Sequence, residues 1–143
     1  MKLSVVDVEG VIRSAAFSAG ILTPFSFDDH TNRDATASQL GDLFQQENPF
    51  FTFRNVILNS KRVGPTKTAP TRYFGDLFIT YLTKKPSSIK DAKLLEGIAN
   101  KFAEQTLDGI RFRTYTPYPV SKDNGFTAYT GVIDFDFELY RGG

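Results

Sequence analysis

Residues 126–140 read FTAYTGVIDFDFELY and carry the clearest hydrophobic pattern in the chain. From Ile133 onward, every second residue is large and apolar. The positions between them are acidic and share the opposite face: Asp134, Asp136 and Glu138. A period of two is typical of a strand with one buried face. We therefore expect a long strand from Phe126 to Tyr140 whose apolar face contributes to the core.

A hairpin connection precedes this strand. The segment Ser121-Lys122-Asp123-Asn124-Gly125 ends in Asn-Gly, a dipeptide that favours tight turns between antiparallel strands. Upstream, the stretch from Ile110 to Tyr118 is rich in β-branched and aromatic residues, which predicts a strand. Alternation places four of its residues on one face: Ile110, Phe112, Thr114 and Thr116.

Helical spacing of apolar residues predicts two helices. The first runs from about Ser4, a suitable N-cap, to Ala19, with Gly20 as a left-handed C-terminal cap. The second begins with the capping box Ser88-Ile89-Lys90-Asp91 and continues to Gly109. Its apolar stripe includes Leu95, Ala99 and Phe102.

Three further strands are expected in the first half of the chain. Ile21 to Phe27 contains Pro24, which cannot donate to a strand ladder, so this strand belongs at a sheet edge. Pro49 to Leu58 and Arg72 to Lys84 are the other two. The last has apolar residues on both faces, which predicts cover on both sides, by helices or by a neighbouring chain. One helical turn is expected within Gln39 to Gln46.

The resulting order, α-β-β-β-α-β-β, describes a single domain spanning residues 1–143. The helix that begins at Ser88 is a crossover connection, so the strands before and after it are expected to be parallel. The final pair is antiparallel because a hairpin joins its strands. We therefore expect a two-layer α+β domain, in which helices pack on a mixed, mostly antiparallel β-sheet.

The composition excludes several classes of function. The chain has no cysteine and one histidine, His30, which excludes disulfides, thiolate metal sites and multi-histidine zinc sites. It contains neither G-x-G-x-x-G nor a Walker sequence. No signal peptide and no membrane span is expected, and a net charge of +1 indicates no strong attraction to nucleic acid. We predict a protein that is not an enzyme and has no cofactor.

Two acidic clusters leave an alternative open. The face formed by Asp134, Asp136 and Glu138 could hold a metal and act as a small metal-dependent hydrolase. The other interpretation is a solvated strand face, or one that meets a basic neighbour. Asp28-Asp29-His30 could likewise bind a metal, but this composition is also typical of a turn.

The segment from Asn59 to Thr71 is expected to be a long basic loop. With the residue that follows it, this loop carries four cations: Lys61, Arg62, Lys67 and Arg72. Loops of this length are usually functional or disordered. Nucleic-acid binding would require aromatic residues interleaved with the cations. Because the net charge is only +1, we expect the loop to dock on a partner protein, with nucleic-acid binding as the alternative.

In this arrangement the chain resembles the tail terminator (tail completion) proteins of long-tailed phages. The resemblance covers nearly the whole chain as a pattern, except for Asp28 to Asn48. Its features in order are the N-terminal helix, Phe25 and Phe27, and the segments Phe50-Phe51-Thr52-Phe53-Arg54, Arg72-Tyr73-Phe74-Gly75-Asp76-Leu77, Ile98-Ala99-Asn100-Lys101-Phe102, Leu107-Asp108-Gly109-Ile110 and Gly131-Val132-Ile133-Asp134-Phe135-Asp136-Phe137-Glu138.

The resemblance implies a structural virion protein at the head-proximal end of the tail, assembled in the host cytoplasm. Such proteins form a hexameric ring that caps the tail tube, stops its polymerisation and offers a docking surface for the head–tail connector protein. The partners would be further copies of the chain, the tail tube protein and the connector, with genomic DNA only as passing cargo. Under this reading, the basic loop would dock on the tube or a neighbouring subunit, and the acidic face would line the lumen or a subunit junction. Another head–tail neck protein is the nearest alternative.

Overall fold

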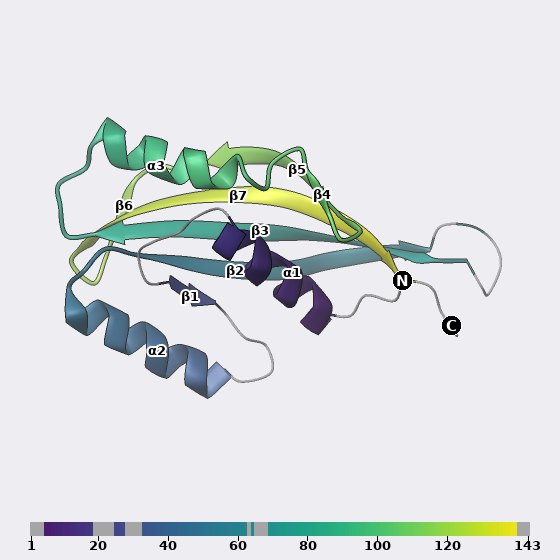
Figure 1. Ribbon diagram of the computed structural model, residues 1–143, viewed down its shortest axis with the longest axis horizontal. Coiled ribbons are helices and arrows are strands. Elements are labelled where there is room, and N and C mark those ends of the chain that lie inside the picture. The colour runs from purple at the N-terminus through teal and green to yellow at the C-terminus, as the bar shows by residue number, and fades with distance from the viewer. Residues whose placement is uncertain (1–4, 19–24, 28–32, 63, 65–68, 140–143) are drawn as a thin grey trace.

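The computed structural model describes residues 5–18, 25–27, 33–62, 64 and 69–139. It shows an α+β domain in which helices pack on a curved, mostly antiparallel sheet (Figure 1). The elements follow in the order α1 (Val5–Ser18), β1 (Phe25–Phe27), α2 (Arg33–Gln46), β2 (Phe50–Arg62), β3 (Thr71–Thr83), α3 (Ile89–Ala99), β4 (Thr106–Leu107), β5 (Ile110–Pro117), β6 (Ser121–Asp123) and β7 (Phe126–Leu139).

The sheet has the strand order β1-β2-β3-β7-β5-β4, and β6 also pairs with β7. Only β1 and β2 pair in parallel; the other neighbouring strands are antiparallel. β3 and β5 run parallel, as the crossover helix predicts, but β7 lies between them. β1 lies at the edge of the sheet, as expected for the segment that follows Pro24.

One face of the sheet carries the main core beneath α1 and α3. The helices contribute Val8 and Ile12 from α1 and Leu95 from α3, and all three side chains are at most 2% exposed. Strands contribute mainly aromatic rings: Phe51, Phe53, Tyr81, Phe112, Tyr129, Phe135 and Phe137. This is the apolar face predicted for the C-terminal strand.

Among the described helices, α2 alone packs on the other face, at one end beside the start of β2 (Figure 1). Phe44 of α2 meets Phe50 and Phe126 with ring centroids 5.2 and 5.4 Å apart, in edge-to-face geometry. Leu43 and Leu82 complete this second cluster. Helices therefore cover both faces of β3 near Leu82, and cover by a neighbouring chain stays a prediction for the rest of the strand.

The helices differ from the predicted boundaries in two places. α2 runs from Arg33 to Gln46, although only one turn within Gln39–Gln46 was expected. α3 begins as predicted, since the Ser88 side chain accepts a hydrogen bond from the Asp91 N–H at 3.3 Å. It ends at Ala99, however, and not at Gly109, whose positive φ of 87° forms the turn between β4 and β5.

The strands also contain two departures from the prediction. The expected loop from Asn59 to Thr71 is mostly strand, because β2 continues to Arg62 and pairs with β3 from Thr71 onward. The resulting β2–β3 hairpin projects beyond the helices at the end opposite α2 (Figure 1). In β5, a bulge between Phe112 and Tyr115 turns Tyr115 toward the core, so Thr114 and Thr116 do not share the face of Phe112.

Candidate functional site

The predicted acidic face lies on the side of the sheet opposite α1 and α3. All three acidic residues lie on β7. Asp134 is opposite Asp76 of β3, and Glu138 is opposite Arg72 of β3. Asp136 lies between them and faces Arg111 of β5. The three carboxylates share one face, as alternation predicts, but their surroundings differ.

Asp136 is buried and holds β7 to β5. Its side chain is 1% exposed. Arg111 donates to it through Nε and Nη2, at 2.9 Å to Oδ1 and 3.2 Å to Oδ2, and the Arg113 Nη2 donates to Oδ2 at 2.7 Å. The hydrogen bond from Arg113 to Asp136 raises the pKa of that guanidinium. Two cations thus neutralise this carboxylate, and its oxygens are already engaged within the domain.

Glu138 forms the second ion pair of the face. The Arg72 Nη2 donates to its Oε1 at 2.6 Å, and both side chains are about one-third exposed. This contact joins β3 to β7 near the tip of the β2–β3 hairpin. Arg72, one of the four predicted docking cations, is therefore already paired within the domain.

Asp134 is different, because the nearest side chain across the ladder is also acidic. Asp134 is exposed and accepts a hydrogen bond from the Thr114 N–H at 2.9 Å. Burial raises the pKa of the half-buried Asp76, and the adjacent Asp134 raises it further. Within the described residues, neither carboxylate forms an ion pair, so they remain a like-charged pair at directly opposed positions. Such pairs destabilise a sheet.

A group of basic residues lies near the tip of the β2–β3 hairpin. Lys61 and Arg62 are strand residues opposite Arg72 and Thr71. Both are exposed, and in the described part of the chain neither forms an ion pair. Lys67 lies outside the described residues. The structure thus brings Lys61, Arg62 and Arg72 together on one hairpin.

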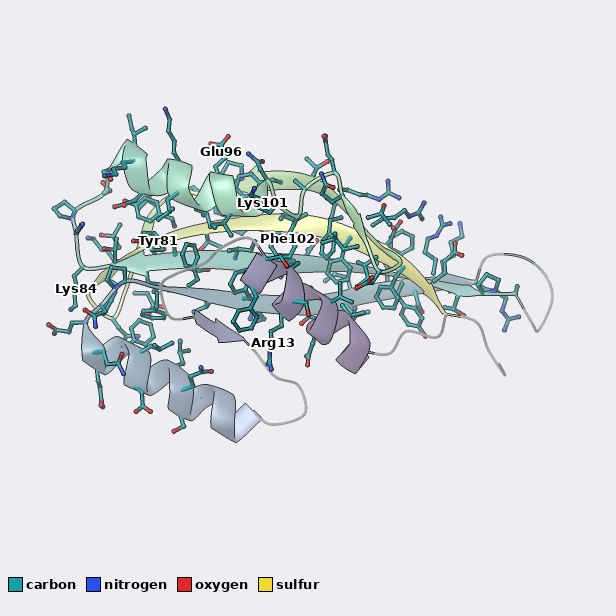
Figure 2. All side chains as sticks on the ribbon, viewed as in Figure 1. Arg13, Tyr81, Lys84, Glu96, Lys101 and Phe102 are labelled. Atoms are coloured by element: carbon teal, nitrogen blue, oxygen red, sulfur yellow. The ribbon has the colours of Figure 1, made fainter. Side chains whose placement is uncertain are left out.

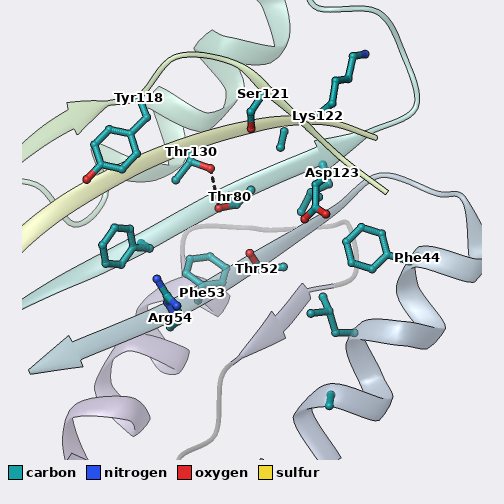
Figure 3. A pocket seen from close by; sticks show the side chains of 15 residues that line it. Phe44, Thr52, Phe53, Arg54, Thr80, Tyr118, Ser121, Lys122, Asp123 and Thr130 are labelled. Carbon is teal, nitrogen blue, oxygen red and sulfur yellow. Dashed lines mark hydrogen bonds between the residues drawn. The ribbon is translucent and has the colours of Figure 1, made fainter. Parts of the chain in front are cut away.

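A groove of about 840 Å³ lies between α2 and the open face of the sheet (Figure 3). Phe44 borders it on the α2 side and Tyr118 on the other, while Thr80 and Thr130, 3.0 Å apart between hydroxyl oxygens, form part of its floor. The Arg54 guanidinium lies over the Phe78 ring, 5.0 Å from its centroid. The groove shows that the sheet face stays open between α2 and Tyr118.

Metal coordination finds little support in this arrangement. Across residues 5–18, 25–27, 33–62, 64 and 69–139, no three acidic or histidine side chains gather as a metal site would require. The Asp28-Asp29-His30 segment lies outside these ranges. Asp136 and Glu138 instead fit the interpretation in which the acidic face meets basic neighbours, since both carboxylates pair with arginines.

The sequence did not predict that Arg111 and Arg113 pair with Asp136. They alternate with Ile110 and Phe112, so their shared face was visible in the pattern. Their acceptor, Asp136, is more than twenty positions away along the chain, and the pairing of β5 with β7 brings it within reach. The exposed Thr114 similarly donates its backbone N–H to Asp134 only because of the β5 bulge.

Comparison with known proteins adds no identification. No protein-family model matches the chain, and no curated protein shows significant sequence similarity to it. Within the described residues, none of the helices has the length and apolar character needed to cross a membrane.

Proposed function

We propose that this protein is a self-assembling structural component of a phage tail, a tail terminator that forms a ring and caps the tail tube. The observation that carries the proposal is that the two sides of the sheet differ. A compact core lies on one side of the sheet. On the other side, part of the sheet face stays open, and Lys61 and Arg62 of the projecting hairpin are exposed without an ion pair among the described residues. Surface of this kind suits contacts with other chains.

The physics of capping requires no catalysis. Tube subunits stack through head-to-tail contacts that do not close, so a tube can grow without limit. A ring with one face matching the tube and a different opposite face would end that growth. The opposite face would receive the head–tail connector. In this role the protein would be part of the virion and would need no cofactor.

The charged groups fit an assembly role better than a hydrolytic one. The most buried carboxylate, Asp136, is neutralised by two arginines and braces two strands. The exposed cations Lys61 and Arg62 lie at the end of the hairpin, where they can reach another molecule. Charges placed at a contact steer association and set its register.

Capping can be tested with tubes polymerised from the tail tube protein of the same phage. We expect the protein to bind one end of each tube and to stop elongation, as seen by electron microscopy. Reversing charge with Lys61→Glu and Arg62→Glu should weaken capping about tenfold or more. The matched control is Lys90→Glu with Lys93→Glu, two exposed positions on α3.

Different results would favour the alternatives. Binding to tailless heads but not to tubes would indicate another neck protein. Thermal stabilisation by a divalent metal that is lost in Asp134→Asn would favour the hydrolase. If tubes keep growing at their normal rate in the presence of the protein, the terminator proposal is wrong.

A further inference from the structure

Part of the sheet face opposite α1 and α3 is apolar and open. Beyond α2, the described residues cover it only in part, where Tyr118 and the Arg54 guanidinium contact the Phe78 ring. Four half-buried apolar side chains occupy it, at positions that the strand register places on one face: Val56, Phe74, Phe78 and Val132. A face of this composition gains free energy when another surface covers it.

The acidic pair lies within this apolar surface. Val56 is opposite Asp76 on the β2 side, and Asp134 is opposite Asp76 on the β7 side. Two carboxylates in this position repel each other, and covering the face would strengthen that repulsion by removing water. An occupant that supplies a cation between them would remove the penalty. Charge therefore selects a basic partner.

The same chain presents such a group but cannot deliver it to its own acidic pair. Lys61 is exposed and opposite Arg72, which is four positions before Asp76 on β3. Four residues of strand span ~13 Å, beyond the reach of a lysine side chain. Arg72 is closer but is held by Glu138. Arg113 also interacts with Asp134, but its guanidinium donates to Asp136, and the Arg54 guanidinium lies over the Phe78 ring. A neighbouring copy can supply a cation without such a contact, because its exposed Lys61 lies on the projecting hairpin (Figure 1).

We propose that the β2–β3 hairpin of one copy docks on the open sheet face of the next, with Lys61 between Asp76 and Asp134. Each copy can offer Lys61 to one neighbour and Asp76 to another, so the contact can repeat from copy to copy and close into a ring. The inference rests on the proposed self-assembly and names the surfaces that carry it. The tail tube plays no part in it.

Crosslinking can test the contact, because the chain has no cysteine of its own. Lys61→Cys and Asp76→Cys are prepared as separate proteins, mixed, and treated with a short bismaleimide crosslinker. We expect a covalent dimer in the mixture and little in either protein alone. Lys93→Cys, on the helix side of the sheet, replaces Lys61→Cys in the control mixture and should give no such product.

Charge variants test the same contact without a crosslinker. Lys61→Glu should weaken association about tenfold or more, as should Asp76→Lys, and the double variant should recover it, since the opposite charges then meet with exchanged signs. Lys93→Glu is the matched control. Asp76→Asn separates assembly from folding: it removes a repelled carboxylate, so the monomer should be at least as stable while association weakens.

Two failures are distinguishable. If the wild type forms rings but the Lys61→Cys and Asp76→Cys mixture gives no more dimer than the control mixture, assembly stands and this interface is wrong. The same follows if Asp76→Asn associates as strongly as the wild type. If the wild type remains a monomer throughout, the proposed self-assembly itself fails, and this interface fails with it.

Discussion

Replacing both Arg111 and Arg113 with alanine is expected to destabilise the domain by about 3 kcal/mol, near the lower end of the range for a buried ion pair that loses one partner. Asp136 is only 1% exposed and would be left buried without either guanidinium partner. The loss stays near the lower end because the arginines are about half exposed, so their removal admits water to the carboxylate.

Chemical denaturation measures this effect, and two further variants define its cause. Adding Asp136→Asn to the double variant should recover much of the lost stability, because the uncompensated charge disappears. Lys90→Ala with Lys93→Ala removes the same number of cations from the exposed α3 and should change stability by less than about 0.5 kcal/mol. A double arginine variant as stable as this control would show that Asp136 does not depend on its partners.

Phe102→Ala is expected to cost about 3–5 kcal/mol, as for other fully buried phenylalanines. Phe102 follows α3 and is 0% exposed, and its ring contacts Phe53 and Phe112 at centroid distances of 6.3 and 5.5 Å (Figure 2). The cavity left by the ring would lie in the main core, where α3 meets the strands. A loss of this size is a large part of the stability of a typical domain.

Thermal or urea denaturation would show the loss directly. Ile89→Ala is the control, since Ile89 is 76% exposed at the start of the same helix and should lose little. A Phe102→Ala domain within about 1 kcal/mol of the wild type would mean that the core re-packs around the missing ring. The buried Phe102 ring would then contribute little to the stability of the core.

Much of the fold could be predicted from local patterns that point to one structure only. Strict alternation after Ile133 is incompatible with a helix, and β7 forms there. Asn124 and Gly125 both adopt positive φ, at 50° and 80°, as a tight hairpin turn requires. The Ser88 cap likewise appears where the capping box predicts it. In each case the deciding interaction lies within a few residues.

Features that depend on distant partners could not be predicted in the same way. α2 is mostly polar, and its few apolar residues gain their contacts only when Phe50, Leu82 and Phe126 come together. Asn59 to Arg62 has no strand pattern of its own and pairs because β3 provides the ladder. The candidate site shows the same limit. Alternation predicted the acidic face, but no local pattern predicted that arginines of β5 would pair with it.

The charged residues of the sheet fall into two groups, those paired within the domain and those without an ion pair among the described residues. Asp136 and Glu138 are neutralised inside the domain and stabilise it. Asp76, Asp134 and Lys61 form no ion pair among the described residues. This division underlies the proposal that the protein works as an assembly part.

The most direct test is the mass of the purified protein in solution, measured by light scattering over a range of concentrations and combined with negative-stain images. We expect a discrete oligomer, most simply a hexamer, that appears as a ring with a central opening. A protein that remains monomeric at every concentration and shows no rings would contradict the central claim that its open surface exists to bind further copies.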